Sequence, residues 1–131
     1  MWVRDLDAMC DFYVSAFGAR VGALYRNPAK GFASRFLSFD GGMRLELMST
    51  TLLEPAAHAP GAQRMGLTHL AIALDSADEV DALTQRLREA GHAVLDGPRL
   101  TGDGYYESVV LDPEGNRMEL CCAGSVRSTT S

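Results

Sequence analysis

Cysteines, long apolar runs and basic residues are all scarce in this sequence. There are only three cysteines, Cys10, Cys121 and Cys122, and two of them are neighbours in the chain. An odd number of cysteines with this spacing suits a reducing compartment, so we expect a cytoplasmic protein without disulfide bonds. No apolar run approaches the roughly 20 residues of a membrane span, and the start of the chain has no signal-peptide pattern. We therefore expect no membrane partner.

The charge balance excludes a second class of partner. The sequence carries 17 acidic and 12 basic residues, for a net charge of −5. Because no basic stripe is present to neutralise phosphates, we expect no nucleic-acid partner. A length of 131 residues, with 47% hydrophobic and 22% charged residues, is typical of one globular domain. An anionic small molecule would need local donors, since the chain has no overall field to attract it.

Two segments with helical spacing of apolar residues divide the chain into similar halves. The first, residues 5–17, has Asp5 as an expected N-cap and Gly18 as its stop. The second, residues 77–90, ends before Gly91 in the same way. Each helix is followed by three strand-like runs, at 20–26, 32–39 and 43–49 in the first half and at 92–97, 105–111 and 117–122 in the second. This order indicates a duplication.

The sequence predicts one domain, residues 1–131, built of two repeats. Residues 50–66 are rich in alanine, proline and glycine, which is typical of a linker. The remaining boundaries are 1–49 for the first repeat, 67–123 for the second and 124–131 for a flexible tail.

A glutamate lies at the same place in each repeat. Glu119 stands in "RMELC", in the middle of a strand that otherwise looks buried, and Glu46 stands likewise in "RLELM". Gly18 precedes Glu46 by 28 residues, and Gly91 precedes Glu119 by 28 residues. Two buried-looking carboxylates at matching positions indicate a shared site.

A histidine interrupts the strand that opens the second repeat. His69 lies in "LTHLAIAL", residues 67–74, which is otherwise apolar apart from Thr68. The corresponding strand of the first repeat is almost absent, because only three residues precede Arg4. The repeat offset places a counterpart of His69 three to five residues before Met1.

These motifs resemble those of the vicinal oxygen chelate superfamily, which includes glyoxalase I, methylmalonyl-CoA epimerase, extradiol dioxygenases, and fosfomycin and bleomycin resistance proteins. The matching motifs are "THLAIAL", "MRLELM" and "YYESVVLDPEGNRMEL", and the likeness spans essentially the whole chain. The resemblance implies an α+β fold. Two βαβββ modules would form a partly open eight-stranded sheet around a divalent metal, with the first strand largely missing here. Members usually pair as dimers, so we expect a homodimer or a swapped assembly.

The resemblance also implies a ligand set. Glu46, His69 and Glu119 match three of the four metal positions of the glyoxalase-like and epimerase-like members, and the fourth ligand is expected upstream of Met1. Carboxylate and imidazole ligands suit zinc, nickel, cobalt, manganese or iron. Glu119 or Glu46 would be the catalytic base, and the sequence does not choose between them.

The function that this ligand set favours is that of a metal-dependent lyase or isomerase resembling glyoxalase I. Such an enzyme would enolise a small oxygenated or thiol-conjugated substrate. One alternative is a metal-free binding protein of the bleomycin-resistance kind, against which the retained ligands count. The other is a dioxygenase or a thiol transferase, whose members typically use two histidines and one glutamate.

Three further residues are candidates for substrate binding. Tyr105 and Tyr106 enter a strand from the glycine-broken loop at residues 99–108, and alternation allows only one of them to line a cavity. That loop is either a pocket rim or a plain hairpin connection. Arg35 either pairs with an acidic substrate or is an ordinary surface arginine.

Overall fold

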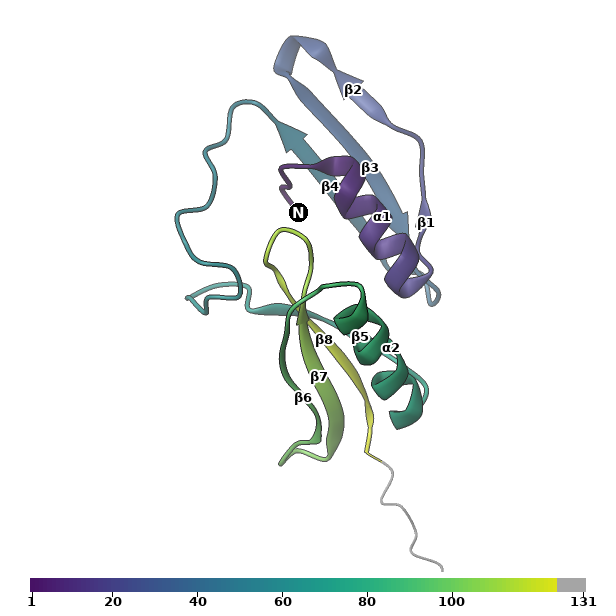
Figure 1. Cartoon of the computed structure of the whole chain (residues 1–131). Helices are drawn as coiled ribbons and strands as arrows, with labels where there is room; N and C mark the ends of the chain where they lie inside the picture. Colours follow the sequence, from purple (N-terminus) through teal and green to yellow (C-terminus); the bar gives the residue numbers. More distant parts are fainter. Residues whose placement is uncertain (125–131) are drawn as a thin grey trace, which may run out of the picture. The chain divides into compact units, whose positions relative to one another are not determined.

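The computed structural model describes residues 1–124 (Figure 1). The chain divides into two compact units, Met1–Ala59 and a second unit that begins at Pro60, and each is described by itself. Apart from Gly124, the predicted tail at 124–131 lies outside the described residues. No helix in the described part of the chain is long and apolar enough to cross a membrane.

The first unit is a helix followed by a four-stranded sheet. Its elements are α1 (Leu6–Phe17), β1 (Arg20–Val21), β2 (Tyr25–Asn27), the short helix η1 (Pro28–Lys30), β3 (Phe32–Ser38) and β4 (Arg44–Thr50). Strand β3 pairs antiparallel with β4 on one side and with both β1 and β2 on the other. The predicted order of helix and strands is therefore found in this half.

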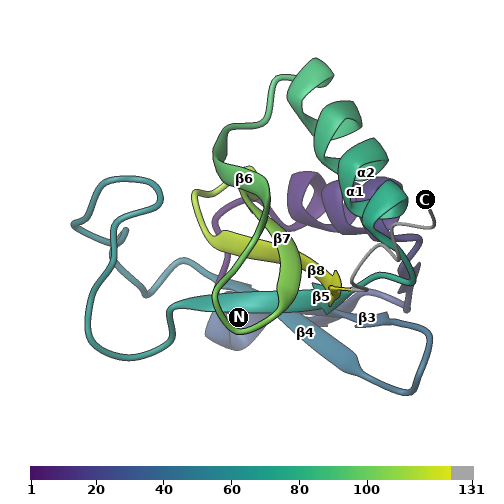
Figure 2. The ribbon, with the colours of Figure 1, turned by 90° about the horizontal axis from the view of Figure 1, so that it is seen from below.

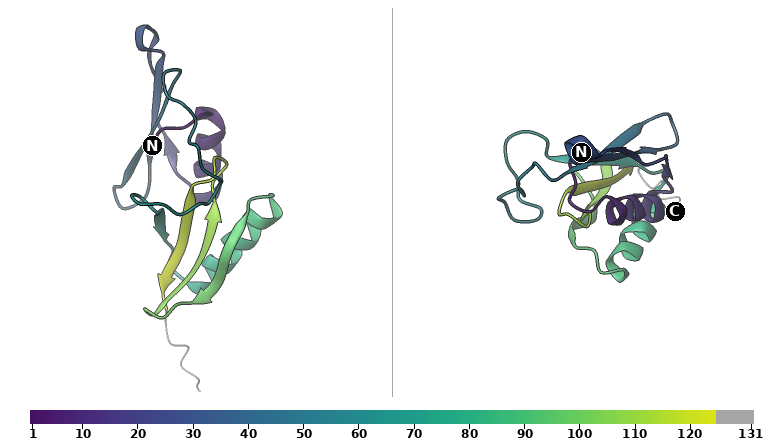
Figure 3. Two further views of the ribbon diagram at one scale, coloured as in Figure 1. Left: turned by 90° about the vertical axis from the view of Figure 1, so that its left-hand side faces the viewer. Right: turned by 90° about the horizontal axis from the view of Figure 1, so that it is seen from above.

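Helix α1 begins and ends as its sequence predicts. The Asp5 carboxylate accepts a hydrogen bond from the Ala8 amide at 3.0 Å, and Gly18 ends the helix with a φ of 65°. Glycine adopts this left-handed conformation without the steric cost that other residues meet. The helix contacts β3 and β4 and buries its apolar face against them (Figure 3). Leu37 and Leu47 lie fully buried on those strands, so the core of this unit lies between helix and sheet.

The start of the chain pairs with the edge of this sheet. Trp2 forms a parallel bridge with Met48 on β4, and the Val3 amide donates to the Met48 carbonyl at 2.8 Å. The Met48 amide donates in turn to the Met1 carbonyl at 2.9 Å. These bonds place residues 1–3 where a first strand would run beside β4.

One predicted strand, residues 20–26, is found in two pieces. Val21 pairs with Leu37 and Tyr25 pairs with Ser34, so the outer strand has one residue more than β3 over this stretch. The Gly22 amide still donates to the Phe36 carbonyl at 2.8 Å, which keeps the strand attached around the irregularity. The alternation of side chains in the sequence does not reveal this bulge, because an extra residue alters how the backbone of one strand pairs with the next and leaves no mark on the residue types.

The second unit repeats the arrangement in a more regular form. Its elements are β5 (His69–Ala73), α2 (Ala77–Glu89), β6 (Val94–Leu100), β7 (Tyr105–Leu111) and β8 (Arg117–Ala123). The four strands form one sheet in the order β5-β8-β7-β6, with β5 parallel to β8 and the other pairs antiparallel. The parallel pair β5–β8 corresponds to the bridge between Trp2 and β4 in the first unit.

Helix α2 covers one face of this sheet (Figure 2). The Ser76 hydroxyl accepts from the Glu79 amide at 3.2 Å and caps the helix. The apolar face of the helix and the inward residues of β7 and β8 are buried together: Val80, Leu83, Leu87, Val110, Met118, Leu120 and Cys122. Thr84 and Ser108 lie in the same core, with their hydroxyl oxygens 2.7 Å apart.

The turn between β7 and β8 is fixed by hydrogen bonds to one carboxylate. Asp112 is buried, and its Oδ1 accepts from the amides of Glu114 and Asn116 at 3.0 Å each. The end of the predicted linker lies against this turn, because the Gly61 amide donates to the Gly115 carbonyl at 2.9 Å. Arg117 Nη1 donates to the Gly61 carbonyl at 3.0 Å. These bonds fix the start of β8, the strand that carries Glu119.

The architecture is mixed α+β with two four-stranded open sheets, which confirms the predicted fold class. In each unit the glutamate singled out by the repeat lies on the last strand. Glu46 pairs with Phe36 across β3 and β4, and Glu119 pairs with Val109 across β7 and β8.

Candidate metal centre

His69 and Glu119 meet on one face of the second sheet. His69 Nε2 lies 3.2 Å from Glu119 Oε2. Ala71 pairs with Glu119 in the parallel ladder, and His69 lies two residues before Ala71 on the same face of β5. The two side chains are 36% and 18% exposed, so the contact is open to solvent but not freely solvated. The structure therefore brings together two of the three predicted ligands.

A third ionisable side chain, Glu107, lies beside this pair. Glu107 is two residues before Val109, the partner of Glu119, so it lies on the same face of β7 as Glu119 does on β8. The side chain of Glu107 is hydrogen-bonded to that of Glu119. His69, Glu119 and Glu107 thus come from three adjacent strands, β5, β8 and β7.

The electrostatics of this face are those of crowded negative charge. Partial burial raises the pKa of Glu107 above its usual value, and the neighbouring Glu119 charge and hydrogen bond raise it further. Burial also raises the pKa of the Cys121 thiol, with smaller contributions from Glu119 and Glu107. Cys121 lies two residues after Glu119 on the same face and is half-buried. The raised pKa values mean that the negatively charged forms of Glu107 and Cys121 are disfavoured at this position. A cation bound nearby would stabilise those charged forms.

Glu46 occupies the corresponding face of the first sheet. Its cross-strand partner Phe36 lies under the guanidinium group of Arg44, with 4.1 Å between the Arg44 Cζ and the ring centroid. Met48 and its bridge partner Trp2 lie on the same face. Glu46 is half-buried, and the positively charged ammonium group of Met1 interacts with its negative charge.

Arg35 and Tyr106 lie on the opposite faces of their sheets from the glutamates. Arg35 pairs with Leu47, whose side chain is buried under α1, and its Nη1 donates to the Gly22 carbonyl at 2.8 Å. The Tyr106 hydroxyl donates to Asp81 Oδ1 on α2 at 2.6 Å. Helices cover both of these faces, so neither side chain shares the face of the glutamate on its own sheet.

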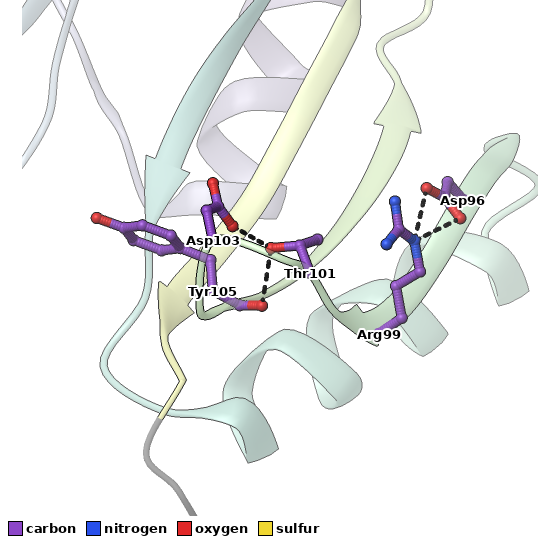
Figure 4. A network of polar contacts seen from close by, with 5 residues as sticks. All are labelled: Asp96, Arg99, Thr101, Asp103 and Tyr105. Carbon is purple, nitrogen blue, oxygen red and sulfur yellow. Dashed lines mark hydrogen bonds and ion pairs between the residues drawn. The ribbon is translucent and has the colours of Figure 1, made fainter.

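Tyr105 lies on the same face as Glu107, at the open end of β7. The connection that leads to it is a tight hairpin: the Thr101 amide donates to the Tyr105 carbonyl at 2.7 Å, and Gly104 donates back to Thr101 at 3.1 Å. The Thr101 hydroxyl is shared between Asp103 and the Tyr105 carbonyl (Figure 4). This hydroxyl lowers the pKa of Asp103. The connection is therefore a hairpin, and a role for it as a pocket rim stays a prediction.

The donor types on these faces fit a divalent metal. Imidazole nitrogen and carboxylate oxygen are ligands for borderline divalent ions, and His69 with Glu119 already presents one of each within contact distance. Within residues 1–124, no three His, Cys, Asp or Glu side chains stand together in an arrangement that would hold a metal as it is. The whole ligand set, Glu46, His69, Glu119 and the position expected before Met1, thus remains a prediction.

Glu107 is the residue that the sequence analysis missed. The signal was present, since alternation from Tyr105 places Glu107 on the same face and the five-residue turn sets the β7–β8 register. Glu107 was overlooked because it has no counterpart in the first repeat, where Ser34 occupies the matching position opposite β4.

The chain is similar in sequence to one known protein and in fold to several solved structures. A protein from Bacillus subtilis, YqjT, is 38% identical over 71 residues, which are 52% of this chain. The match spans only about half, 53%, of that relative's own length. A glyoxylase/bleomycin resistance protein/dioxygenase domain from Frankia sp. EAN1pec superposes with a TM-score of 0.77 at 21% identity, over 93% of this chain and 86% of that one.

A glyoxalase I from Leishmania major, described as trypanothione-dependent, superposes with a TM-score of 0.71 at 22% identity. The superposition covers 94% of this chain and 82% of the Leishmania chain. At these identities the two structures establish a shared fold. The family model for the Glyoxalase/Bleomycin resistance protein/Dioxygenase superfamily matches residues 1–120. The chain belongs to this superfamily.

Proposed function

We propose that the protein is a metal-dependent lyase or isomerase that enolises a small oxygenated or thiol-conjugated substrate. The observation that carries the proposal is the 3.2 Å contact between His69 Nε2 and Glu119 Oε2. Glu46 supports it, because it occupies the matching position of the other repeat. The shared fold of a trypanothione-dependent glyoxalase I supports a thiol conjugate as the substrate class.

The proposed ligands are Glu46, His69 and Glu119, with a fourth expected before Met1. When bound, a divalent ion would polarise two neighbouring oxygens of the substrate and lower the cost of the negative charge left when a proton leaves carbon. The donor set suits zinc, nickel, cobalt, manganese or iron. We infer a homodimer with a small molecule as its partner, in line with the superfamily.

The reaction assigned to the protein's own residues is a proton transfer. The carboxylate of Glu119 or of Glu46 takes a proton from one substrate carbon and returns it to the neighbouring carbon. Glu119 has the better-defined surroundings, because His69 and Glu107 both contact its carboxyl group and limit its orientation. Tyr105, two residues before Glu107 on the same face, is the substrate-binding candidate that shares the face of Glu119.

Metal content of the purified chain, measured by elemental analysis, tests the centre. We expect near-stoichiometric metal that is lost in His69→Ala and retained in the control His58→Ala, whose histidine lies in the linker. Deuterium uptake from heavy water into thiol hemiacetals and acyl thioesters then tests the proton transfer. We expect uptake to be lost in Glu119→Gln or Glu46→Gln, whichever is the base. A chain that binds no metal would contradict the proposal and favour the metal-free binding protein.

A further inference from the structure

Three aromatic rings lie next to one another on the first sheet. Phe32 is on β3, the strand between β4 and β2 (Figure 1). Trp2 reaches Phe32 from beyond β4, and Tyr25 reaches it from β2 on the other side. The ring centroids are 6.0 Å apart both for Trp2 with Phe32 and for Tyr25 with Phe32. Phe32 is therefore flanked by one ring on each side.

Strand register places all three rings on the face of this sheet that α1 does not cover. On β4, Met48 and Thr50 point to the same face, and they pair with Trp2 and Phe32 respectively. The partner of Tyr25 on β3 lies two residues after Phe32, so Tyr25 joins the same face. The helix packs against the opposite face, with the buried leucines of β3 and β4.

The outer two rings are exposed and steeply inclined to the middle one. The plane of Trp2 is at 88° to that of Phe32, and the plane of Tyr25 is at 61° to it. Trp2 is 50% exposed and Tyr25 is 56% exposed, so solutes can reach both rings. Two rings raised on either side of a third form the kind of arrangement in which aromatic side chains surround an alkylated ammonium group.

A cation of the chain already lies over another ring of this face. The Arg44 guanidinium is 4.1 Å from the ring centroid of Phe36, next to the half-buried carboxylate of Glu46. Within residues 1–124, no cation of the chain lies over the three neighbouring rings. Aromatic faces and a carboxylate on one surface attract positive charge. The three rings are therefore a place where a cation from solution can bind.

We propose that Trp2, Phe32 and Tyr25 form an aromatic box that binds the alkylated ammonium group of a small molecule. The inference goes beyond the proposed function and needs no metal, and all three rings belong to the first unit. A cation within about 6 Å of a ring centroid is attracted to the electron-rich face of the ring. An alkylated ammonium group fits better than a bare one, because its methyl groups bury apolar ring surface and a bare ammonium group is strongly hydrated.

Tryptophan fluorescence tests the box directly, because Trp2 is the only tryptophan in the sequence. The full chain, kept metal-free by a chelator, is titrated with tetramethylammonium and with choline, and NaCl holds the ionic strength constant. The control ligand is the neutral alcohol in which carbon replaces the nitrogen of choline, so that the shape is kept and the charge is lost. We expect a saturable change in emission with both cations and a much weaker response to the neutral alcohol.

Variants of one outer ring test the same box by affinity. Tyr25→Leu removes the ring, and its matched control Tyr25→Phe keeps the ring and loses only the hydroxyl. We expect Tyr25→Leu to raise the apparent Kd for tetramethylammonium by about 5- to 30-fold, the ratio typical of one cation–ring contact, and Tyr25→Phe to leave it nearly unchanged. Urea unfolding shows whether each variant keeps the fold, and the two choline-shaped ligands test the charge in the unaltered chain.

The outcomes for the box and for the proposed function are distinct. An emission that responds to neither cation, or responds equally to the neutral alcohol, would overturn the box. Equal affinities of Tyr25→Leu and Tyr25→Phe would overturn it as well. The metal content and the proton transfer are measured with other probes, so the lyase can fail while the box stands, and the box can fail while the lyase stands.

Discussion

At the scale of single residues, Glu107 makes stability depend on pH. Its pKa is raised in the folded chain, mainly by burial and then by Glu119, so the folded state holds a proton that the unfolded state releases at lower pH. Stability of the metal-free chain should therefore fall as pH rises from the unfolded value of about 4.5 through the raised folded value.

Urea unfolding between pH 4 and pH 8 in the presence of a chelator measures this effect. In Glu107→Gln the contribution should be absent, so the variant gains stability relative to the unaltered chain at neutral pH and not at pH 4. Parallel curves for the two proteins over the whole range would show that Glu107 titrates as it does in the unfolded chain.

The buried hydroxyl pair of the second core offers a double-mutant cycle. The Thr84 hydroxyl donates to the Val80 carbonyl at 2.6 Å, so its contact with Ser108 Oγ requires Ser108 to donate. Thr84→Val keeps the shape but leaves the Ser108 hydroxyl buried without this partner, at a cost of about 1–3 kcal/mol. The double variant Thr84→Val/Ser108→Ala should cost less than the sum of the two single variants. Additive free energies of unfolding would contradict a coupled pair.

At the scale of elements, β6 approaches the backbone of Glu107 closely at Gly97. This glycine has a φ of 75°, and a Cβ atom there would collide with the Glu107 carbonyl oxygen. Gly97→Ala should destabilise the chain by about 1–3 kcal/mol, because it adds backbone strain and separates β6 from β7.

Gly102→Ala is the matched control for this prediction. Gly102 lies in the next connection, where a Cβ would meet nothing within 4 Å. Equal urea midpoints for the two variants would show that the close approach at Gly97 does not affect the free energy of unfolding.

The elements themselves were largely predictable from sequence. Both helices and the strands at 32–39, 43–49, 105–111 and 117–122 follow from apolar periodicity and from capping residues such as Asp5 and Gly18. The bulge that splits 20–26 was not, because a one-residue excess depends on how two strands pair, and a single strand's composition does not record it.

The candidate site was only partly predictable from sequence. Repetition singled out Glu46 and Glu119, and the structure shows that His69 contacts Glu119. Repetition could not reveal Glu107, which has no counterpart in the first repeat. Alternation alone could not show that the face bearing Arg35 and the face bearing Tyr106 are each covered by a helix. Which face of a strand is open depends on packing across the sheet.

At the scale of the whole molecule, a bound metal should stabilise the fold. An ion that binds the folded chain and not the unfolded one adds about 2.7 kcal/mol at a free concentration 100 times its Kd. Scanning calorimetry of the chain with Zn²⁺ or Co²⁺ should show a higher Tm than with a chelator. The increase should disappear in His69→Ala. An equal increase in that variant would place the ion elsewhere.

Assembly is a separate prediction. The resemblance to the superfamily leads us to expect a homodimer, which sedimentation velocity measures directly. A single species with the mass of one chain, 14.1 kDa, at micromolar concentration would contradict it.

The parallel pairing of β5 with β8 has a kinetic consequence. The antiparallel partners β6, β7 and β8 follow one another along the chain, whereas His69 must close a loop of about 50 residues to reach Glu119. Contacts near in sequence form at a lower entropic cost, so we expect the meander of β6, β7 and β8 to form before β5 docks. In pulse-labelled hydrogen exchange during refolding, the β7 and β8 amides should gain protection first. The imidazole of His69 would then reach the Glu119 carboxylate only after β8 is already in place, so this contact would be among the last that the nascent chain forms.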